Sequence, residues 1–565
     1  MSGSIDPGLR GALMVCGTSS DAGKSQVVTG LCRLLARSGI RVAPFKAQNM
    51  ANNSFVTQSG HEIGRAQGVQ ALAAGVEPEV AMNPVLLKPT GDRTSQVVVM
   101  GRPVGHLSAV DYHELKPTLL EQVLVALADL RSRFDVVVIE GAGSPAEINL
   151  LDHDIVNLRI AHEADAHAVV VGDIDRGGVF AALHGTVDLL PARYRRLVGG
   201  FVINKFRGDL ALLLDGTAQL EARSGVPTLG VVPWLHDIAL DAEDSLALHG
   251  LRPRPISAPS EGGDRLDVAV IRFPCLSNFT DLDALAIEPG VSVRYVGSAG
   301  SLGSPDLLVL PGTKATVADL AWLRDEGLDT AIVDAVTDPD GPVVLGICGG
   351  YQMLGRTIAD PRAIESAEPV DAPGLGLLDV TTTFDPEKVT CQRRGRACDE
   401  AMTGYEIHHG CVTHGPRAEP WINLDPPGGP VPVPVATAHE VDEVSDNPGV
   451  NRHSSVARRE PADDHRHERT CPSTGTAPDT EGAVDAGGRV RGTNLHGLLE
   501  SDGFRVAFLV GVARRRGKVF VPAGVSFAAA RAAQFDRVAD ALAVHVDLDR
   551  LSTLIATHPP PEEPR

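Results

Sequence analysis

Aromatic residues are scarce in this chain of 565 residues, where phenylalanine, tryptophan and tyrosine together make up 4%. Proteins that bind single-stranded nucleic acid stack the bases on aromatic side chains, so we do not expect this function. Basic residues are also outnumbered, with 51 lysines and arginines against 72 aspartates and glutamates, and the formal net charge is -21. That charge argues against nucleic acid or an anionic membrane surface as the main partner.

Long apolar runs and paired cysteines are missing as well. No apolar segment has the length of a transmembrane helix, and the first residues lack the basic and then apolar pattern of a secretion signal. The eight cysteines are scattered without a C-x-x-C pair, which argues against both a disulfide scaffold and a zinc site. We therefore expect a cytoplasmic protein that does not bind membranes.

One stretch, PVVLGICGGYQMLG at residues 342–355, predicts a cysteine nucleophile. An apolar segment leads to Cys348, which lies between Gly346 and Gly350, and a helix-forming segment follows. This is the pattern of a nucleophile elbow with cysteine in place of serine. The helix N-terminus beneath the side chain would favour the thiolate, and the N–H of Gly349 would point at an oxyanion. A small buried cysteine after a strand is the alternative interpretation.

A cysteine nucleophile needs a base and a second oxyanion donor. The backbone at Gly312, in a Pro-Gly-Thr turn after a predicted strand, could be that donor, although a turn without a catalytic role is the alternative. His496 follows a short apolar run and precedes a glycine, as a base on a strand-end loop would. His408 and His409 are alternative bases. The acid that would orient the histidine stays open, with Glu500 as the nearest downstream carboxylate.

A glycine-rich loop near the N-terminus predicts phosphate binding. A short apolar run ends in GTSSDAGKS, residues 17–25, and an amphipathic helix follows. Backbone N–H groups of such a loop hold phosphates, while Lys24 would reach the β and γ oxygens of ATP and Ser25 would bind Mg²⁺. Five residues rather than the usual four separate Gly17 from Gly23, and a turn that binds nothing is the alternative. The expected nucleotide-binding residues are Gly17, Thr18, Asp21, Gly23, Lys24, Ser25, Asn204 and Lys205.

Apolar segments alternate with helical patterns through the first half, and polar clusters follow the apolar segments. This alternation predicts a doubly wound parallel sheet, in which ligands bind at the carboxyl ends of the strands. We expect the clusters to meet there, although each one could be a solvated loop or a helix cap. The candidate residues for binding the substrate are Lys46, Gln48, Asn49, Glu147, Asn149, Asp152, Asp154, Asp175 and Arg176.

Carboxylates at strand ends beside a phosphate loop suit Mg²⁺. Glu140 and Asp173 each end a predicted strand, so we expect them to bind the metal or its waters. Asp152 and Asp154 could contact the metal or orient the acceptor. Asp154 could equally cap the helix that starts near Ile155.

The predicted fold class is α/β, with two doubly wound, mostly parallel-sheet domains. Residues 1–250 would form an ATP-dependent synthetase domain, and 251–264, rich in proline, serine and glycine, would form a linker. Residues 265–556 would form the cysteine domain, followed by a tail at 557–565. Within it, the proline-rich and charged stretch 416–488 is predicted to be a largely disordered insertion.

The two predicted sites suggest one reaction in two places. The cysteine would attack the side-chain amide of glutamine and release ammonia through a thioester. The first domain would use ATP and Mg²⁺ to phosphorylate a carboxylate, and ammonia would displace the phosphate to leave an amide.

The sequence resembles the cobyric acid synthases, the glutamine-dependent amidotransferases of cobalamin biosynthesis. This resemblance spans nearly the whole chain. The residues that carry it are GTSSDAGKS (17–25), PFKAQNMANNS (44–54), MNPVLLKP (82–89), EGAGSPAEINL (140–150), DIDRGGVFA (173–181), NKFRGD (204–209), LPGTK (310–314), GICGGYQMLG (346–355), GYEIHHG (404–410) and LHG (495–497). The resemblance implies a first domain similar to dethiobiotin synthetase and a second domain of the class I glutamine amidotransferases.

The resemblance also implies the substrates: ATP, glutamine and the corrinoid adenosylcobyrinic acid a,c-diamide, which would be amidated at its b, d, e and g carboxylates. By the family motif, Cys348 is the nucleophile and His496 the base. Leu498 stands where class I enzymes usually carry a glutamate, so the third member of the catalytic group stays open. The related cobyrinic or hydrogenobyrinic acid a,c-diamide synthase is the nearest alternative. A partition-type switch ATPase and a scaffold with an inactive amidase are alternatives from other classes.

Overall fold

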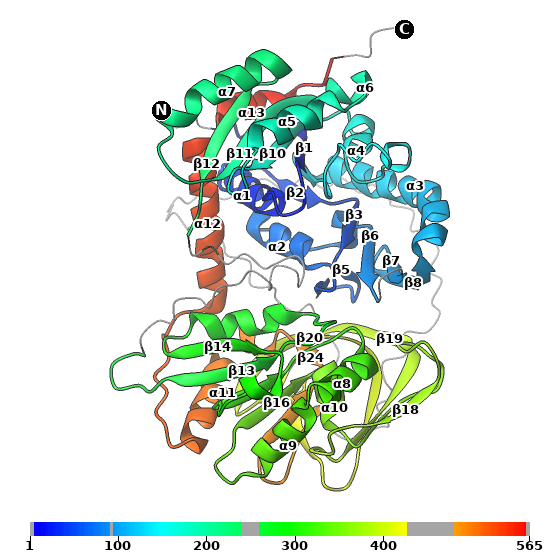
Figure 1. Ribbon diagram of the computed structural model, residues 1–565, viewed down its shortest axis with the longest axis vertical. Coiled ribbons are helices and arrows are strands. Elements are labelled where there is room, and N and C mark those ends of the chain that lie inside the picture. The colour runs from blue at the N-terminus through cyan, green and yellow to red at the C-terminus, as the bar shows by residue number, and fades with distance from the viewer. Residues whose placement is uncertain (1–4, 91–93, 237, 239–258, 427–478, 561–565) are drawn as a thin grey trace, which may run out of the picture.

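The computed structural model describes residues 5–90, 94–236, 238, 259–426 and 479–560. Two large sheets lie one above the other in Figure 1, each with helices packed against it. The predicted α/β class is confirmed. Among the described residues, no helix is both long enough and apolar enough to cross a membrane.

The first sheet has six parallel strands in the order β12-β11-β10-β1-β9-β2. Strand β10 is buried along its whole length because helices cover both faces of the sheet. Along β1, Met14 packs into the core beneath α3 and α5, whereas Leu13 and Val15 pack into the opposite core beneath α1. The strands are β1 (Gly11–Gly17), β2 (Val42–Phe45), β9 (Val136–Glu140), β10 (His167–Asp173), β11 (Val198–Phe206) and β12 (Thr228–Pro233).

Helices join these strands in the right order for a doubly wound sheet. They are α1 (Lys24–Arg37), α2 (Arg65–Ala74), α3 (Ala109–Arg133), α4 (Leu158–Glu163), α5 (Val179–Asp188), α6 (Ala192–Arg195) and α7 (Ala211–Ser224), with the short 3₁₀ turns η1 (Val80–Met82) and η2 (Leu151–His153).

A second, smaller layer was not foreseen in the sequence. Four strands form a sheet in the order β3-β6-β7-β8, and two more form the antiparallel hairpin β4–β5. These strands are β3 (Gln48–Met50), β4 (Ser54–Val56), β5 (Glu62–Gly64), β6 (Val85–Pro89), β7 (Thr94–Val99) and β8 (Arg102–Ser108). Several are only three residues long, too short for a recognisable hydrophobic period.

The second sheet has a parallel core of five strands, β14-β13-β15-β16-β23, which antiparallel and mixed pairs extend on one side. The apolar segment that leads to Cys348 forms a strand, as the nucleophile-elbow pattern predicts. The core strands are β13 (Leu266–Ile271), β14 (Val291–Val296), β15 (Leu307–Leu310), β16 (Val343–Ile347) and β23 (Val490–Thr493). The extension contains β17 (Thr357–Asp360), β18 (Val370–Pro373), β19 (Val380–Ala397), β20 (Glu400–His414), β21 (Glu419–Leu424), β22 (Thr480–Val484) and β24 (Leu495–His496).

Short helices surround this second sheet and carry some of its polar residues. They are η4 (Phe279–Ile287), η5 (Ala299–Ser301), α8 (Thr316–Asp325), α9 (Leu328–Thr337), α10 (Gly349–Leu354), η6 (Leu498–Glu500) and α11 (Asp502–Arg515).

The last two helices, α12 (Phe527–His545) and α13 (Leu548–Ala556), correct the predicted domain boundary. We call the half of the molecule that is built on the six-stranded sheet the P-loop half. In Figure 1, α12 runs up the side of this half, where its Leu542 joins the hydrophobic core beneath α1. A Cβ at Gly30 of α1 would lie 2.6 Å from Leu542, so glycine permits this close approach. The predicted cysteine domain, 265–556, therefore extends too far, because α12 and α13 contribute side chains to the core beneath α1.

The stretch 416–488 is also corrected at its two ends. Strands β21 and β22 lie within it and pair with each other, and β22 pairs with β23 of the parallel core. Cross-strand pairing thus orders segments whose composition suggested disorder. Residues 427–478 lie outside the described residues, as does most of the predicted linker at 251–264.

Candidate active sites

The loop after β1 has the backbone geometry of a phosphate loop. Gly23 has a φ of 105°, and a Cβ there would lie 2.0 Å from Nδ2 of Asn204, so glycine is required. The ammonium of Lys24 donates to the carbonyl oxygens of Ser19 (3.0 Å) and Gly143 (3.2 Å). These two carbonyl oxygens hold the Lys24 ammonium beside the loop, and the ammonium could exchange them for the oxygens of a bound phosphate.

Glu140 lies at the end of β9 beside this loop, and it is fully buried. Its carboxylate accepts hydrogen bonds from Ser25 Oγ (2.8 Å), Lys46 Nζ (3.0 Å) and Gln70 Nε2 (2.5 Å). Burial tends to raise the pKa of Glu140, but the Lys46 ammonium and the hydrogen bonds hold that pKa below its usual value. An ionised carboxylate next to a serine hydroxyl is a donor set that fits Mg²⁺.

Asp173, the other predicted metal ligand, has a competing partner. Its Oδ2 lies 2.8 Å from Nζ of Lys205, and its Oδ1 accepts the N–H of Asp175. Lys205 also donates to the carbonyl of Asp21 (2.7 Å), so it connects the end of β11 to the phosphate loop. Both carboxylates thus pair with a lysine, and Glu140 is the one that also accepts a hydrogen bond from Ser25, the predicted Mg²⁺ ligand. Among the described residues, no group of three or more His, Cys, Asp or Glu side chains could by itself hold a metal.

A cavity of about 750 Å³ opens beside the phosphate loop. Of the predicted substrate residues, Lys46, Gln48, Asn49, Glu147 and Asp154 line it together with Lys24, Ser25 and Lys205. The other four, Asn149, Asp152, Asp175 and Arg176, are not part of its wall as the described residues form it.

Asp154 has a second role that the sequence left open. Its carboxylate accepts the backbone N–H groups of Val156 (2.8 Å), Asn157 (2.9 Å) and Arg159 (3.2 Å) at the start of α4. These bonds are those of a residue that caps a helix, so part of its hydrogen-bonding capacity is structural.

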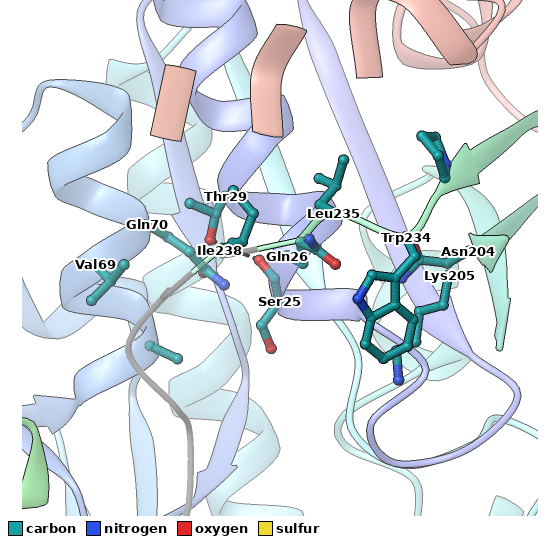
Figure 2. A pocket seen from close by; sticks show the side chains of 12 residues that line it. Ser25, Gln26, Thr29, Val69, Gln70, Asn204, Lys205, Trp234, Leu235 and Ile238 are labelled. Atoms are coloured by element: carbon teal, nitrogen blue, oxygen red, sulfur yellow. Dashed lines mark hydrogen bonds between the residues drawn. The ribbon is translucent and has the colours of Figure 1, made fainter. Parts of the chain in front are cut away.

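A second cavity of about 240 Å³ adjoins the first and shares Ser25, Gln26 and Lys205 with it. Figure 2 shows Trp234 and Lys205 on one side of this cavity and Gln70 on the other. The guanidinium of Arg207 lies 3.8 Å from the ring centre of Trp234 and fixes the indole by a cation–π contact.

The second site centres on Cys348, between β16 and α10. Its φ of 49° and ψ of -112° are strained values for a residue other than glycine, as expected at a nucleophile elbow. Its N–H donates to the carbonyl of Thr493 (2.7 Å), which fixes the turn. A Cβ at Gly350 would lie 1.9 Å from the carbonyl oxygen of Leu310, so this glycine lets α10 approach β15.

The two predicted oxyanion glycines lie on either side of this turn. Gly349 approaches the loop after β15, because a Cβ there would lie 2.6 Å from Cγ2 of Thr313. A Cβ at Gly312 would lie 2.9 Å from Cε1 of His496, so this part of the loop faces the imidazole. Both backbones are therefore close to where an oxyanion would form.

His496 ends β24 beside Cys348 and is 1% exposed. Its Nδ1 lies 2.7 Å from Oδ2 of Asp281, whose Oδ1 accepts the N–H of Gly497 (2.8 Å). Burial alone would lower the pKa of His496, but the Asp281 carboxylate and the hydrogen-bonded Cys348 raise it to about 10. The three groups have the order of a catalytic triad: the thiol could act as nucleophile, the imidazole as base and the carboxylate as the acid that orients the imidazole.

The alternative bases and the alternative acid have other contacts. His408 bonds through Nδ1 with the carbonyl of Gly410, and burial lowers the pKa of His409 to about 3. The two oxygens of Glu500 pair with Arg65 (2.8 Å) and Arg531 (3.0 Å).

A cavity of about 30 Å³ lies beside Cys348. Lys314, which is buried, and Glu365, which is partly buried, both line it, so it offers one cation and one anion. Burial lowers the pKa of Lys314 and raises that of Glu365. Lys88 of the P-loop half also lines it, so both halves enclose this site.

Comparison with known proteins finds a matching domain family for each half of the chain. Residues 13–247 match the CobQ/CobB/MinD/ParA nucleotide binding domain, and residues 267–431 match the CobB/CobQ-like glutamine amidotransferase domain. A cobyric acid synthase from Nocardia farcinica is 48% identical over 554 residues, which cover 98% of both chains. The chain belongs to the cobyric acid synthase family. Its similarity to cobyric acid synthases from Rhodococcus jostii (98% of this chain, 96% of the relative) and Streptomyces coelicolor (98% of each chain) is also 48% identity.

Membership in the cobyric acid synthase family confirms the resemblance predicted from the motifs. The chain is an enzyme, a glutamine amidotransferase of cobalamin biosynthesis that carries a P-loop nucleotide-binding domain. Likeness to solved structures is weak: PurLQS from Thermotoga maritima matches 44% of this chain and 99% of its own with 14% identity and a TM-score of 0.27.

In this member of the cobyric acid synthase family, sequence reasoning missed Asp281, Trp234 and Glu365. Asp281 lies 215 residues before His496, and no local spacing connects the two. Trp234 directly follows β12, and its place at the carboxyl end of a parallel strand is the signal that could have marked it.

Proposed function

We propose that this enzyme amidates the b, d, e and g carboxylates of adenosylcobyrinic acid a,c-diamide, with ammonia from glutamine. One observation carries the proposal: a single chain combines a phosphate loop beside a large cavity with Cys348, His496 and Asp281 in hydrogen-bonded order. The first arrangement suits carboxylate activation by ATP, and the second suits amide hydrolysis.

In the glutaminase site, the Cys348 thiol gives its proton to Nε2 of His496 and attacks the glutamine amide carbon. The backbone N–H groups at Gly349 and Gly312 stabilise the oxyanion that forms. The C–N bond then breaks, ammonia leaves with a proton from the imidazolium, and a thioester remains on Cys348. Water hydrolyses the thioester and releases glutamate.

Glutamine carries an α-carboxylate and an α-ammonium, which need a cationic and an anionic partner respectively. Lys314 would bind the carboxylate, and Glu365 would bind the ammonium. Two observations support these roles: both side chains line the cavity at Cys348, and Lys314 is buried while Glu365 is partly buried. A charged group buried away from water is costly unless a partner compensates it, and bound glutamine would supply that partner.

In the synthetase site, a substrate carboxylate attacks the γ-phosphorus of ATP, and ADP leaves. Ammonia then attacks the acyl phosphate, and phosphate leaves to give the amide. Residues Gly17, Thr18, Asp21 and Gly23 would surround the phosphates with Lys24. The adenine base of ATP would enter the smaller cavity, whose wall includes Asn204, Pro233 and Trp234 and which adjoins the phosphate loop.

Mg²⁺ would neutralise charge on the phosphate oxygens, and Ser25 and Glu140 are the residues that would hold it, with Asp173 as a weaker candidate. Lys46, Gln48, Asn49 and Glu147 would contact the acceptor, since they line the larger cavity.

Mass spectrometry of the corrinoid after incubation with enzyme, ATP, Mg²⁺ and glutamine tests the substrate. We expect the adenosylated a,c-diamide to gain four amides. Cobyrinic acid, offered in parallel, should remain unchanged. Amidation of cobyrinic acid at its a and c positions instead would identify an a,c-diamide synthase.

A further inference from the structure

Asn278 connects the P-loop half of the molecule to the glutaminase base. Its Oδ1 accepts the backbone N–H of Ser54 in β4 at 2.9 Å, and its Nδ2 lies 3.3 Å from Nε2 of His496. All three residues are buried. Asn278 has a φ of 50° and a ψ of 35°, a left-handed conformation that asparagine adopts more readily than most residues.

The orientation of the Asn278 amide follows from its partners. A backbone N–H can only donate, so the side-chain oxygen of Asn278 must face Ser54 and its NH₂ group must face His496. On the other edge of the ring, Asp281 as a carboxylate can only accept, so Nδ1 of His496 carries a proton. The neutral ring therefore has its lone pair on Nε2, where the Asn278 amide donates into it.

This hydrogen bond opposes the first step of glutamine hydrolysis. Nε2 of His496 must take the proton of Cys348, but a protonated Nε2 would face the NH₂ of Asn278 as one donor against another. The amide therefore favours the neutral imidazole and thiol over the imidazolium and thiolate.

Ser54 contacts the base on a second side as well. Its carbonyl accepts the hydroxyl of Tyr405 at 3.3 Å, and the Tyr405 ring stacks on His496 with 5.4 Å between ring centres. One residue of β4 thus holds both the amide at the edge of the imidazole and the aromatic ring on its face.

The hairpin of β4 and β5 is also bonded to the wall of the acceptor cavity. Gly64, at the end of β5, donates to Oδ1 of Asn83 (2.9 Å), whose Nδ2 donates to the carbonyl of Lys46 (3.0 Å). Lys46 lines the 750 Å³ cavity. A contiguous set of hydrogen bonds therefore joins that cavity to Ser54 and the base.

We propose that Asn278 is a positioning residue through which the P-loop half controls His496, restraining glutamine hydrolysis while Ser54 is bonded to its amide. A shift of β4 that breaks this bond lets the amide rotate and present its oxygen to Nε2, which favours the imidazolium and so activates Cys348. The inference rests on the roles proposed above for Cys348 and His496.

The pH dependence of His496 also reflects the other ionisable groups around it. From the elements packed against it these are Asp281 and Asp283 of η4, Cys348, Tyr405, Glu406, His408 and His409 of β20, Glu500 of η6, Lys314, Glu365, and Lys88 and Lys388. The Asn278→Gly variant leaves all of them in place and adds no ionisable group, so a change in its pH profile reports on the amide.

Asn278→Asp tests the proposal because it keeps the shape and replaces the NH₂ donor by an oxygen. Glutamate release from glutamine, measured without ATP or corrinoid, should rise about tenfold, and the alkaline limb of its pH profile should move about one pH unit higher. The imidazolium is then stabilised, so the reactive ion pair persists to higher pH. Stimulation by ATP and corrinoid should fall in proportion. Asn278→Gly, in which glycine fits the left-handed backbone, should change the rate of glutamate release and its pH profile in the same direction as Asn278→Asp.

Ser54→Pro removes the N–H from the P-loop side, whereas Ser54→Ala keeps it. We expect Ser54→Pro to move the alkaline limb of glutamate release to higher pH and Ser54→Ala to leave it where it is. Ammonia-dependent amidation shows that each variant is folded. An unchanged alkaline limb in both Asn278 variants, or the same alkaline limb in both Ser54 variants, would overturn the inference. Glutamine hydrolysis by Cys348→Ala would instead refute the proposed function.

Discussion

The imidazole of His496 is held between a carboxylate and a thiol, and this pairing determines its chemistry. Asp281 fixes the proton on Nδ1 at 2.7 Å and favours the charged ring. Under the roles proposed above, the imidazolium that would form when Cys348 loses its proton is stabilised inside a buried site.

Asp281→Asn should lower glutamine-dependent activity by about 10²- to 10⁴-fold, because the neutral amide stabilises neither the imidazolium nor the correct tautomer. Initial rates of glutamate release measure the effect, and ammonia-dependent amidation should persist.

Glu500→Gln is the matched control for this prediction, since Glu500 pairs with arginines rather than with His496. Its loss of glutamine hydrolysis should be much smaller. Equal losses in the two variants would contradict the assignment of Asp281 as the orienting acid.

For single residues, the sequence predicts those functional positions that belong to a short local motif. The glycines around Cys348 and the lysine and serine of the phosphate loop lie in short motifs, because a tight turn and a helix N-terminus each need a few consecutive residues. Asp281 could not be predicted, since only the fold brings η4 next to β24. Asn149 and Asp152 were predicted as substrate residues from proximity in sequence, yet they lie outside the cavity wall.

At the scale of elements, α12 and α13 link the end of the chain to its beginning. Arg33 of α1 pairs with Asp536 of α12 (2.8 Å), and the N–H of Asp547 donates to the carbonyl of Leu229 in β12 (2.7 Å). Leu542 is 1% exposed in the core beneath α1. These contacts make α12 part of the P-loop half.

Leu542→Ala should therefore destabilise the P-loop half by about 2 to 5 kcal/mol, the usual cost of a cavity in a core. Scanning calorimetry of the full chain should show its thermal transition at a lower temperature. Val544→Ala, on the exposed side of the same helix, should change stability by less than about 0.5 kcal/mol. Equal shifts for the two variants would contradict this packing.

The predicted domain boundaries assigned α12 to the wrong half, since they placed the residues up to 556 in the cysteine domain. Helix formation follows from alanine content and period within the segment, whereas the partner of a helix depends on long-range packing. The short strands of the β3-β6-β7-β8 sheet were missed for a related reason, since their pairing and not their local pattern defines them.

At the scale of the whole molecule, ionic contacts join the two halves next to the glutaminase site. Glu62 of β5 lies 2.5 Å from Lys88 of β6 and 2.5 Å from Lys388 of β19. Burial raises the pKa of Glu62, but the two ammonium groups hold it below its usual value, so the carboxylate stays ionised. Lys88 and Lys388 both line the cavity at Cys348, so ammonia would be released where the halves meet.

The central claim is that one chain holds two separable reactions, and two variants test it together. Corrinoid amidation is measured by mass spectrometry for Cys348→Ala and for Lys24→Ala, each with glutamine and with ammonia. We predict that ammonia restores amidation in Cys348→Ala and does not restore it in Lys24→Ala, while Lys24→Ala still hydrolyses glutamine. Loss of ammonia-dependent amidation in a folded Cys348→Ala, or amidation by Lys24→Ala at the wild-type rate, would contradict the account.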